Sequence, residues 1–312
     1  MSGPCAVGEG QPVETRLSAL TLARKVTVRL RRIPGTYPVL DALRRRSYSA
    51  GVVTVSDYDG TLRMELDLSE HMASQIFWFG YYSRDVLFAI ERMLTPGSVF
   101  LDIGANIGEV SLFASKRVGE RGSVLAFEPV AGTADRLRRN LALNDLHNVE
   151  VIEMGISDQI REQALYASAA SFDDGSRHDG LGTLYASRAR SSPVATIKLT
   201  TLDALLSARQ IARVDGIKLD IEGAELPALY GARQVLTRFR PWLVVEIGEE
   251  TCAAAGYAPR DIFDLLDSLD YAGYVIGRKG KLRSASSEAM GRWQNVLFTP
   301  RGGRTGDGGG RR

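Results

Sequence analysis

The pattern of apolar and polar positions is regular from residue 98 to residue 300. Apolar runs alternate with stretches in which apolar residues recur every three or four positions, the spacing of one helix face. The runs predict strands over 98–103, 123–127, 149–154, 216–221, 242–247, 272–277 and 295–299. The stretches between them predict helices over 109–118, 131–144, 202–209, 224–238 and 259–270. Strands that alternate with helices indicate an α/β fold with a doubly wound, mostly parallel sheet.

Two connections depart from this alternation. The last two predicted strands are joined without a helical pattern, so we expect them to form an antiparallel pair at one edge of the sheet. Residues 168–193 are mostly small and polar, over a length too great for a simple connection. Long segments of this kind are lids, binding loops or disorder.

The first 95 residues follow a different pattern, and we expect them to form an N-terminal extension. Residues 51–68 alternate apolar and polar on both sides of Asp59-Gly60, a dipeptide that accepts the positive φ angles of a hairpin turn. Residues 71–94 are aromatic at first and then helical in spacing. The main domain is therefore predicted over 96–300, and the Gly- and Arg-rich residues 301–312 are predicted to be a disordered tail.

Charge is concentrated in one part of this extension. Between residues 16 and 46, nine Lys or Arg residues accompany a single acid, Asp41. A helix of this composition is usually a solvated surface helix, but it also suits peripheral contact with an anionic membrane or with an acidic substrate. The net charge of the whole chain is only +2, so nothing favours nucleic acid as a partner.

The two cysteines, Cys5 and Cys252, lie far apart and have no spacing typical of a disulfide framework or a zinc site. The first residues lack the basic start and apolar core of a secretion signal. No apolar run is long enough to span a bilayer. We therefore expect a cytoplasmic protein.

The first group of candidate ligand-binding residues lies in the turn "DIGANIG", after the first strand of the main domain. In an open parallel sheet, ligands bind at the carboxyl ends of the strands, where a helix N-terminus points toward the site. Gly104 and Gly108 would let a ligand approach the backbone beside Ala105, but Asn106 stands where a dinucleotide fingerprint has glycine. Asp102, just ahead of the turn, would repel a pyrophosphate and attract an ammonium group.

These features favour S-adenosylmethionine, which carries an ammonium, a cationic sulfonium and a ribose diol but no phosphate. Asp102 can receive its amino-acid end, directly or through water. Glu128 ends the second strand, twenty residues after Gly108, where an acid can accept two hydrogen bonds from the ribose hydroxyls. Ser157 and Asp158 follow the third strand and are placed to contact the adenine edge.

Several segments together resemble the FkbM family of S-adenosylmethionine-dependent methyltransferases. They are "FLDIGANIGEVSLFAS", "AFEP", "NLALNDLHNVEVIEMGISD", "TTLDALL", "IKLDIEGAELPALYGA", "RPWLVVEI" and "NVLFTP". The resemblance implies a class I methyltransferase fold, Rossmann-like, with a seven-stranded sheet whose last strand is antiparallel. It also implies O-methylation of a hydroxyl on a small molecule such as a sugar, a polyketide or a related natural product.

The segment "KLDIEGAE" is expected at the same rim, near the transferable methyl group. Asp220 is the candidate for contacting the donor or the acceptor hydroxyl, and Glu222 is the candidate general base. Glu225 is better explained as an acid that favours the N-terminus of the following helix. Lys218 points to the same side as Asp220 and could neutralise it or Glu246.

Several alternatives stay open. Asp220, Glu222 and Glu246 could instead bind a divalent metal, although no spacing demands one and no metal is predicted. His71 or His178 could serve as base, and the aromatic run that ends in Tyr82 could cover the donor or belong to the core. The function could also be that of a nicotinamide-dependent oxidoreductase or of a non-catalytic interaction module with this fold. A homodimer is compatible with the sequence.

Overall fold

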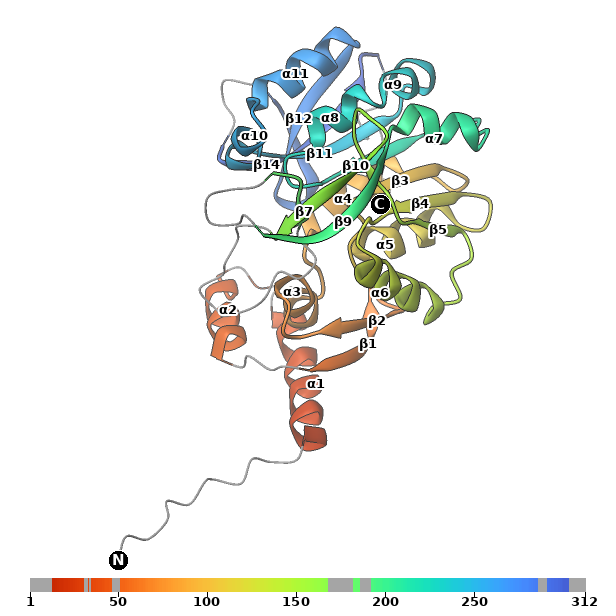
Figure 1. Ribbon diagram of the computed structural model, residues 1–312. Helices are drawn as coiled ribbons and strands as arrows, with labels where there is room; N and C mark the ends of the chain where they lie inside the picture. The colour runs from red at the N-terminus through yellow and green to blue at the C-terminus, as the bar shows by residue number, and fades with distance from the viewer. Residues whose placement is uncertain are drawn as a thin grey trace, which may run out of the picture.

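The computed structural model describes residues 13–30, 33, 35–46, 51–167, 182–185, 192–285 and 291–302. Most of the segment 168–193, including His178, lies outside these residues, as do residues 1–12 and 303–312. Predictions of disorder for the two ends therefore stay predictions. Figure 1 shows the extension at one end of the molecule and the main sheet with its helices at the other.

A large mixed sheet forms the centre of the main domain. Its order is β13 (Lys281–Ser284), β12 (Tyr271–Gly277), β14 (Trp293–Pro300), β11 (Trp242–Gly248), β10 (Gly216–Leu219), β3 (Val99–Ile103), β4 (Ser123–Phe127) and β5 (Val149–Ile152). The strands from β11 to β5 are parallel, whereas β14 is antiparallel to both β11 and β12. The predicted fold class with its antiparallel last strand is therefore confirmed.

Two details of the predicted sheet are wrong. The sheet has eight strands among the described residues, because β13 folds back on β12 after a 3-10 turn, η1 (Arg278–Gly280). The antiparallel pair of β12 and β14 does form, but β14 lies between β11 and β12 and not at the edge. Burial explains this position, since Val296, Leu297 and Phe298 are almost fully buried and a strand covered on both faces belongs in the interior of a sheet.

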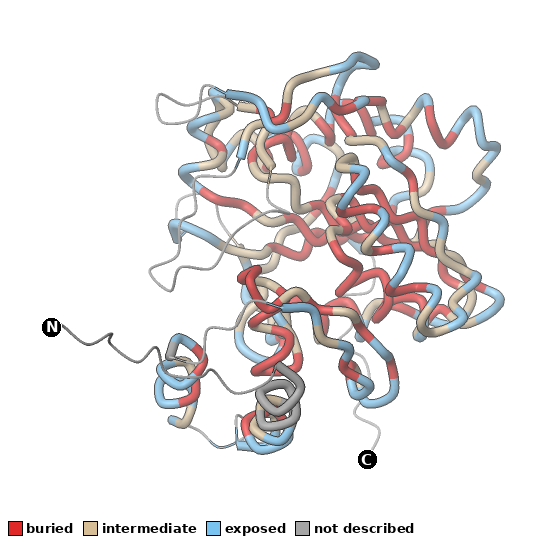
Figure 2. Tube along the Cα trace, turned by 60° about the horizontal axis from the view of Figure 1, so that its bottom comes forward, coloured by how far each residue is buried: buried red, intermediate tan, exposed pale blue. Residues whose placement is uncertain are grey.

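Helices cover both faces of this sheet, as predicted for a doubly wound fold. One apolar core joins the sheet to α7 (Leu202–Ala208), α8 (Glu225–Tyr230), α9 (Arg233–Phe239) and α11 (Pro259–Ser268). Another joins the opposite face to α4 (Arg84–Met93) and α5 (Glu109–Val118). Figure 2 shows the buried segments concentrated along the strands between these layers. The remaining helices of the main domain are α6 (Ala131–Ala142) and α10 (Glu249–Ala254).

The single helix predicted over 224–238 is two helices, α8 and α9. The chain passes against neighbouring backbone at Gly231, where a Cβ would lie 2.0 Å from the carbonyl oxygen of Ser157. The side chain of Asp203 then accepts hydrogen bonds from the N–H groups of Gln234 and Val235, at 3.0 and 2.9 Å. These bonds satisfy amides that a new helix leaves free at its start.

A second, smaller sheet was not predicted. It has the order β6 (Gly155–Ile156), β9 (Pro193–Thr200), β7 (Arg161–Ala167) and β8 (Gly182–Thr183). The predicted strand over 149–154 is consequently divided, since the main sheet ends at Ile152 and the chain enters the second sheet at Gly155. β8 brings part of the predicted long loop back against β7.

The N-terminal extension packs onto the main domain through a shared core. It contains α1 (Val13–Leu30), α2 (Tyr37–Arg46), β1 (Val52–Tyr58), β2 (Leu62–Asp67) and α3 (His71–Phe79). The predicted hairpin turn is confirmed, with φ of 45° at Asp59 and 86° at Gly60. Tyr58 and Met64 of the hairpin are fully buried in a core that also contains Leu112 of α5.

The structure also bears on the expectations about the cysteines and about membrane-spanning segments. Cys252 is a buried free thiol. Within the described ranges, no helix combines the length and the apolar character that crossing a bilayer would require.

The shared core predicts that the hairpin and the main domain unfold together. Met64→Ala should lower the free energy of unfolding by about 2–5 kcal/mol, because it removes a fully buried side chain. Val52→Ala, on the same hairpin but 56% exposed, is the matched control and should change little. Chemical denaturation followed by fluorescence measures both. A separate early transition in Met64→Ala, with the main transition unmoved, would contradict a common core.

Candidate functional site

A cavity opens at the carboxyl ends of β3, β4 and β10. It contains about 940 Å³ of space, part of it open to solvent. The turn after β3 lines it through Gly104, Ala105 and Asn106, and the end of β4 lines it through Phe127 and Glu128. The end of β10 contributes Lys218, Asp220 and Glu222. The structure thus brings together at one rim most of the residues that the sequence predicted for the site.

The two glycines of the turn are required for packing, which corrects the reason given for them above. Gly104 has φ of 81°, and a Cβ there would lie 1.9 Å from the backbone oxygen of Asp220. Gly108 has φ of 98°, and its Cβ would lie 2.4 Å from the side chain of Leu137 on α6. The space beside both glycines is therefore filled by the protein itself, although the backbone at Gly104 still lines the cavity.

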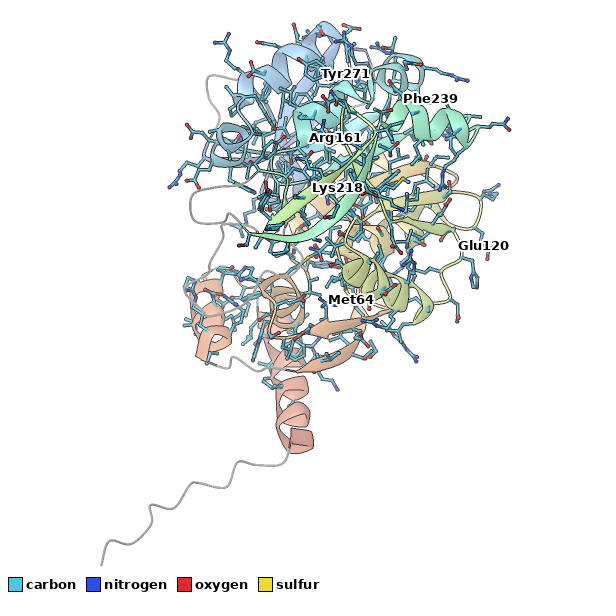
Figure 3. All side chains as sticks on the ribbon, in the orientation of Figure 1. Met64, Glu120, Arg161, Lys218, Phe239 and Tyr271 are labelled. Carbon is cyan, nitrogen blue, oxygen red and sulfur yellow. The ribbon has the colours of Figure 1, made fainter. Side chains whose placement is uncertain are left out.

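A buried ammonium group joins the strand ends. Nζ of Lys218 donates a hydrogen bond to the carbonyl oxygen of Gly104 at 2.7 Å and lies 3.4 Å from Asp220 and 3.5 Å from Asp102. Burial alone would lower the pKa of Lys218, but attraction to Asp220 and Asp102 outweighs it and raises the pKa above its ordinary value. Lys218 is therefore a permanent positive charge beneath the cavity, near the centre of the molecule in Figure 3.

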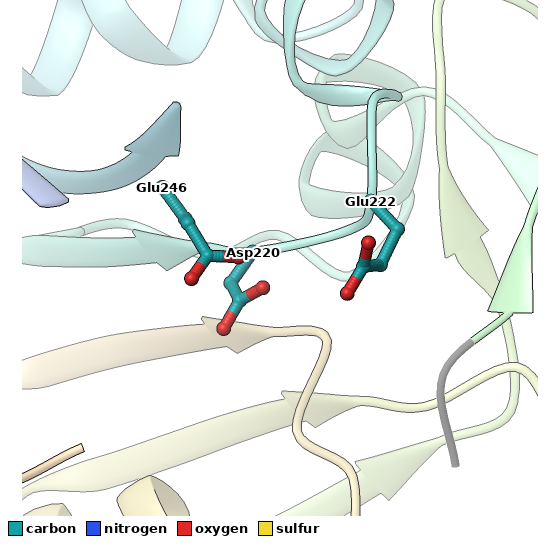
Figure 4. Close-up of side chains that lie close together, drawn as sticks. All are labelled: Asp220, Glu222 and Glu246. Atoms are coloured by element: carbon teal, nitrogen blue, oxygen red, sulfur yellow. The ribbon is translucent and has the colours of Figure 1, made fainter. Parts of the chain in front are cut away.

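Three carboxylates gather above this ammonium. Asp220, Glu222 and Glu246 each place an oxygen within 4.8 Å of the other two, and Figure 4 shows the carboxylates of Asp220 and Glu246 turned toward each other. Burial would raise the pKa of Asp220, but Lys218 lowers it below the usual range. Burial and repulsion from Asp220 raise the pKa of Glu246 well above its usual range. Asp220 is accordingly the stronger acid of this pair, and Glu246 is the weaker one.

These contacts bear on the metal alternative. Asp220 already faces Lys218, and the indole N–H of Trp293 donates to Glu246 at 2.7 Å. A cation would have to compete with both partners. We therefore assign these carboxylates to protons and hydrogen bonds, and the expectation that no metal is needed stays a prediction.

Glu222 is presented to the cavity by a strained turn. Its φ is 54°, a left-handed conformation that is costly for a non-glycine residue. Glu225 fixes this turn, because its carboxylate accepts the N–H groups of Ile221 and Gly223, both at 2.9 Å. Thr183 of β8 donates its hydroxyl to the carbonyl oxygen of Glu222 at 3.0 Å. The predicted structural role of Glu225 agrees with these bonds, whereas Glu222 is left to face the cavity.

The acidity of Glu222 follows from its surroundings. Burial, then repulsion from Asp220 and Glu225, raises its pKa to about 8, with Lys218 acting in the opposite direction. A carboxylate with such a pKa is a stronger base than an ordinary one and titrates close to neutral pH.

Glu128 lies where the sequence placed it, at the end of β4. Its carboxylate accepts the N–H groups of Asn106 and Val130, both at 3.0 Å, so it connects the turn after β3 to the start of α6. Burial raises its pKa to about 7 in spite of these two bonds. Each carboxylate oxygen can accept more than one hydrogen bond, so Glu128 can still bind hydroxyl groups in the cavity.

Three predicted binding residues do not line the cavity: Asp102 and Ser157 are buried behind its wall, and Asp158 is exposed at the surface. Asp102 is fully buried, accepts a hydrogen bond from the hydroxyl of Ser111 at 2.6 Å and faces Lys218. One of its oxygens, Oδ1, lacks a hydrogen-bond partner among the described residues. Ser157 is also fully buried and donates to Asp158 at 3.1 Å. The adjoining residues Met154, Gly155 and Ile156 line the cavity instead. Direct contacts of these predicted residues with a ligand stay predictions.

Two residues of the site were not predicted as site residues: Glu109 was overlooked, and Tyr82 was named only as part of the aromatic run that could cover the donor or belong to the core. Glu109, the first residue of α5, is fully buried and accepts the N–H groups of Tyr82 and Ser83, at 2.5 and 3.0 Å. Burial raises the pKa of Glu109 to about 7. Tyr82 lines the cavity together with Met72, and burial with repulsion from Glu246 raises the pKa of its hydroxyl. Glu109 directly follows the glycine turn, which was the available signal.

A third missed feature is the wall made by the second sheet. Leu165, Leu184, Ile197 and Leu199 line the cavity opposite the main sheet. Residues 194–200, "VATIKLT", alternate exposed and buried side chains over most of their length. This alternation is a strand signal that could have predicted β9.

The remaining candidates contribute less to the site. His71 is buried at the start of α3, with its ring 6.1 Å from that of Tyr82 in an edge arrangement. Phe77, Trp78 and Phe79 are buried in the core of the extension. The core explanation of that aromatic run is therefore confirmed for these three residues.

The strand order and the glycine turn together define a class I, Rossmann-like methyltransferase fold. A model of the methyltransferase FkbM domain matches residues 102–276, which is more than half of the chain. The chain therefore belongs to the FkbM methyltransferase family.

Three curated relatives support this membership. Methyltransferase sdnD of Sordaria araneosa is 31% identical over 189 residues, covering 53% of this chain and 71% of sdnD. The 2-O-methyltransferase NoeI of Sinorhizobium fredii is 25% identical over 196 residues, covering 60% of this chain and 77% of NoeI. The AMB antimetabolite synthetase AmbE of Pseudomonas aeruginosa is 28% identical over 231 residues. That match covers 65% of this chain but only 10% of AmbE, so the chain spans a small part of that relative.

The buried acids predict a pH dependence of stability in the ligand-free chain. The pKa values of Glu109, Glu128 and Glu225 are about 7 and that of Glu222 about 8, above their ordinary value of 4.5. The folded chain therefore binds protons that the unfolded chain has released, and stability is lost as the pH rises through about 7 to 8. Asp220, whose pKa is lowered, titrates below this window.

Scanning calorimetry should give a lower Tm at about pH 8.5 than at about pH 6, with a loss on the order of 1 kcal/mol per group. Glu109→Gln should reduce this pH dependence. Glu250→Gln, at an acid whose side chain is 73% exposed, is the control and should leave it unchanged. A Tm that rises over the same pH interval would contradict the assigned protonation states.

Proposed function

We propose that the protein is an S-adenosylmethionine-dependent O-methyltransferase whose acceptor is a hydroxyl of a small molecule, in the range of sugars, polyketides and related natural products. The observation that carries the proposal is the placement of Glu222, a base with a raised pKa, in the same cavity as Glu128. Family membership supports the class of reaction. The name of NoeI, a 2-O-methyltransferase, supports a hydroxyl acceptor.

The residues of the cavity fit the methyl donor. Glu128 offers carboxylate oxygens for a ribose diol, and Met154 with Ile156 offers an apolar surface for a flat base. Asp102 lies behind the turn with its Oδ1 3.5 Å from Nζ of Lys218, so it adds negative charge behind the cavity wall that would attract an ammonium group. Carboxylates outnumber the one ammonium of Lys218 among these residues, so the site favours a ligand with positive charge.

When bound, the donor supplies a methyl carbon that its sulfonium has already activated for displacement. The protein then has to align the acceptor and remove its proton. Glu222 would accept the hydroxyl proton while the acceptor oxygen bonds to the methyl carbon and the carbon–sulfur bond breaks, so that the sulfur leaves as a neutral thioether. Asp220, held by Lys218, accepts a hydrogen bond from the acceptor and fixes its orientation. Tyr82 and Met72 close the acceptor side from the extension.

The electrostatics of the cavity favour this sequence of events. A cation beside Glu222 lowers the pKa of its carboxyl, so donor binding converts it to the ionised base that the reaction needs. Glu246 is the weaker acid beside Asp220, so a proton on it would limit repulsion within the cluster. The hydroxyl proton thus moves to the carboxylate of Glu222, which the nearby cation keeps ionised.

Glu222→Gln should retain donor binding in calorimetry but lose at least about a hundredfold in turnover, because the amide cannot accept the proton. The activity assay uses a methyl-labelled donor with a metabolite extract and mass spectrometry for labelled products. In the unchanged protein, kcat/KM for the donor should rise with pH through about 8, the pKa of Glu222 in the donor-free chain. Glu250→Gln is the control with normal turnover. Full activity of Glu222→Gln would remove Glu222 as the base, and absence of any labelled product would sink the proposed activity.

A further inference from the structure

The inner faces of α1 and α2 bury polar side chains beside the apolar residues Leu20, Ala23 and Leu40, which pack against the core. Arg24 of α1 is buried, and its guanidinium donates to the carboxylate of Asp57 and to the carbonyl oxygens of Ile76 and Phe77. Thr27, one turn further on, is also buried and donates its hydroxyl to the carbonyl oxygen of Trp78 at 2.9 Å. Polar side chains thus attach α1 to the rest of the extension.

The opposite face of α1 is apolar and basic. Leu22, Val26 and Leu30 are 66%, 50% and 37% exposed, and their spacing of four residues places them in one stripe along the helix. Lys25 and Arg29, also exposed, follow the same spacing beside this stripe. We call these five residues the outer face of α1.

The neighbouring segment repeats the pattern. In α2, Arg44 is buried and paired with Asp41 at 2.8 Å, whereas Val39 and Leu43 are 63% and 47% exposed. Of the thirteen exposed large apolar residues in the described part of the chain, seven lie between residues 22 and 43. Such a concentration marks a surface that binds a partner, because single exposed apolar residues are normally scattered.

We propose that the outer face of α1 docks on an anionic lipid surface. Leu22, Val26 and Leu30 would enter the boundary between headgroups and acyl chains, and Lys25 with Arg29 would lie among the anionic headgroups. In Figure 1, α1 and α2 lie at the end of the molecule away from α9 and α11, outside the main domain.

Charge favours a membrane over a second copy of the chain. A twofold contact through the outer face would bring Lys25 and Arg29 of both copies together. The described residues of this face include no acid to compensate them, and Asp41 of α2 is already paired with Arg44 and Arg45. Two residues of the basic segment predicted for membrane contact, Arg24 and Arg44, are buried. They therefore do not belong to the proposed lipid-binding surface.

The test is flotation of the full-length protein with vesicles of phosphatidylcholine alone or mixed with phosphatidylglycerol. The protein should bind the anionic vesicles and lose binding in high salt. Lys25→Glu with Arg29→Glu should weaken binding at least about tenfold, since each basic residue near an anionic surface contributes roughly fivefold. Leu22→Ser with Val26→Ser should weaken it by a similar factor, through loss of apolar insertion.

Matched controls are Arg233→Glu on α9 and Ile160→Ser, an apolar residue that is 71% exposed and lies in the main domain. Both should bind like the unchanged protein, and circular dichroism should show that all variants are folded. Failure of the unchanged protein to bind anionic vesicles would overturn the proposal. So would binding by both double variants that equals that of the unchanged protein, or a dimer in sedimentation that the Leu22→Ser and Val26→Ser changes dissociate.

Discussion

The ammonium of Lys218 is the contact on which the rest of the site depends. It lies in the middle of the sheet, where β10 and β3 run side by side with Lys218 opposite Asp102. One charge therefore holds the carboxylate below the turn, the carbonyl oxygen within the turn and the carboxylate of Asp220 at the rim. Removing it would leave the fully buried carboxylate of Asp102 and the partly exposed carboxylate of Asp220 without compensation, a cost of several kcal/mol by the usual measure of broken buried ion pairs.

The same arrangement explains why the extension belongs to the site. Glu109 follows the turn directly and accepts the amides of Tyr82 and Ser83, so the end of the extension is fastened to the start of α5. The hydroxyl of Tyr58 donates to the carbonyl oxygen of Glu109 at 2.7 Å, which adds the hairpin to the same point. Residues of the main sheet and of the extension therefore line the same cavity.

The alternation of strand, turn and helix patterns after residue 98 predicted the main sheet. It also predicted the rim that holds Asp220 and Glu222, because parallel strands end at the same edge of a sheet. The pairing of Lys218 with Asp102 could not be predicted, since it depends on the register of two strands more than a hundred residues apart. In the second sheet, β6 and β8 could not be predicted because they have two residues each, too few to show a period, whereas the longer β9 carried a signal that was overlooked. Glu109 was overlooked because its partners are backbone amides, which no side-chain motif reveals.

In the proposed reaction, the carboxylates at the strand ends orient a cationic nucleoside with its methyl group toward Glu222. A crystal structure with S-adenosylmethionine tests this most directly. It should show the ribose hydroxyls bonded to Glu128 and the methyl carbon facing Glu222. A donor bound outside the cavity, or one turned so that its methyl points away from Glu222, would contradict the account.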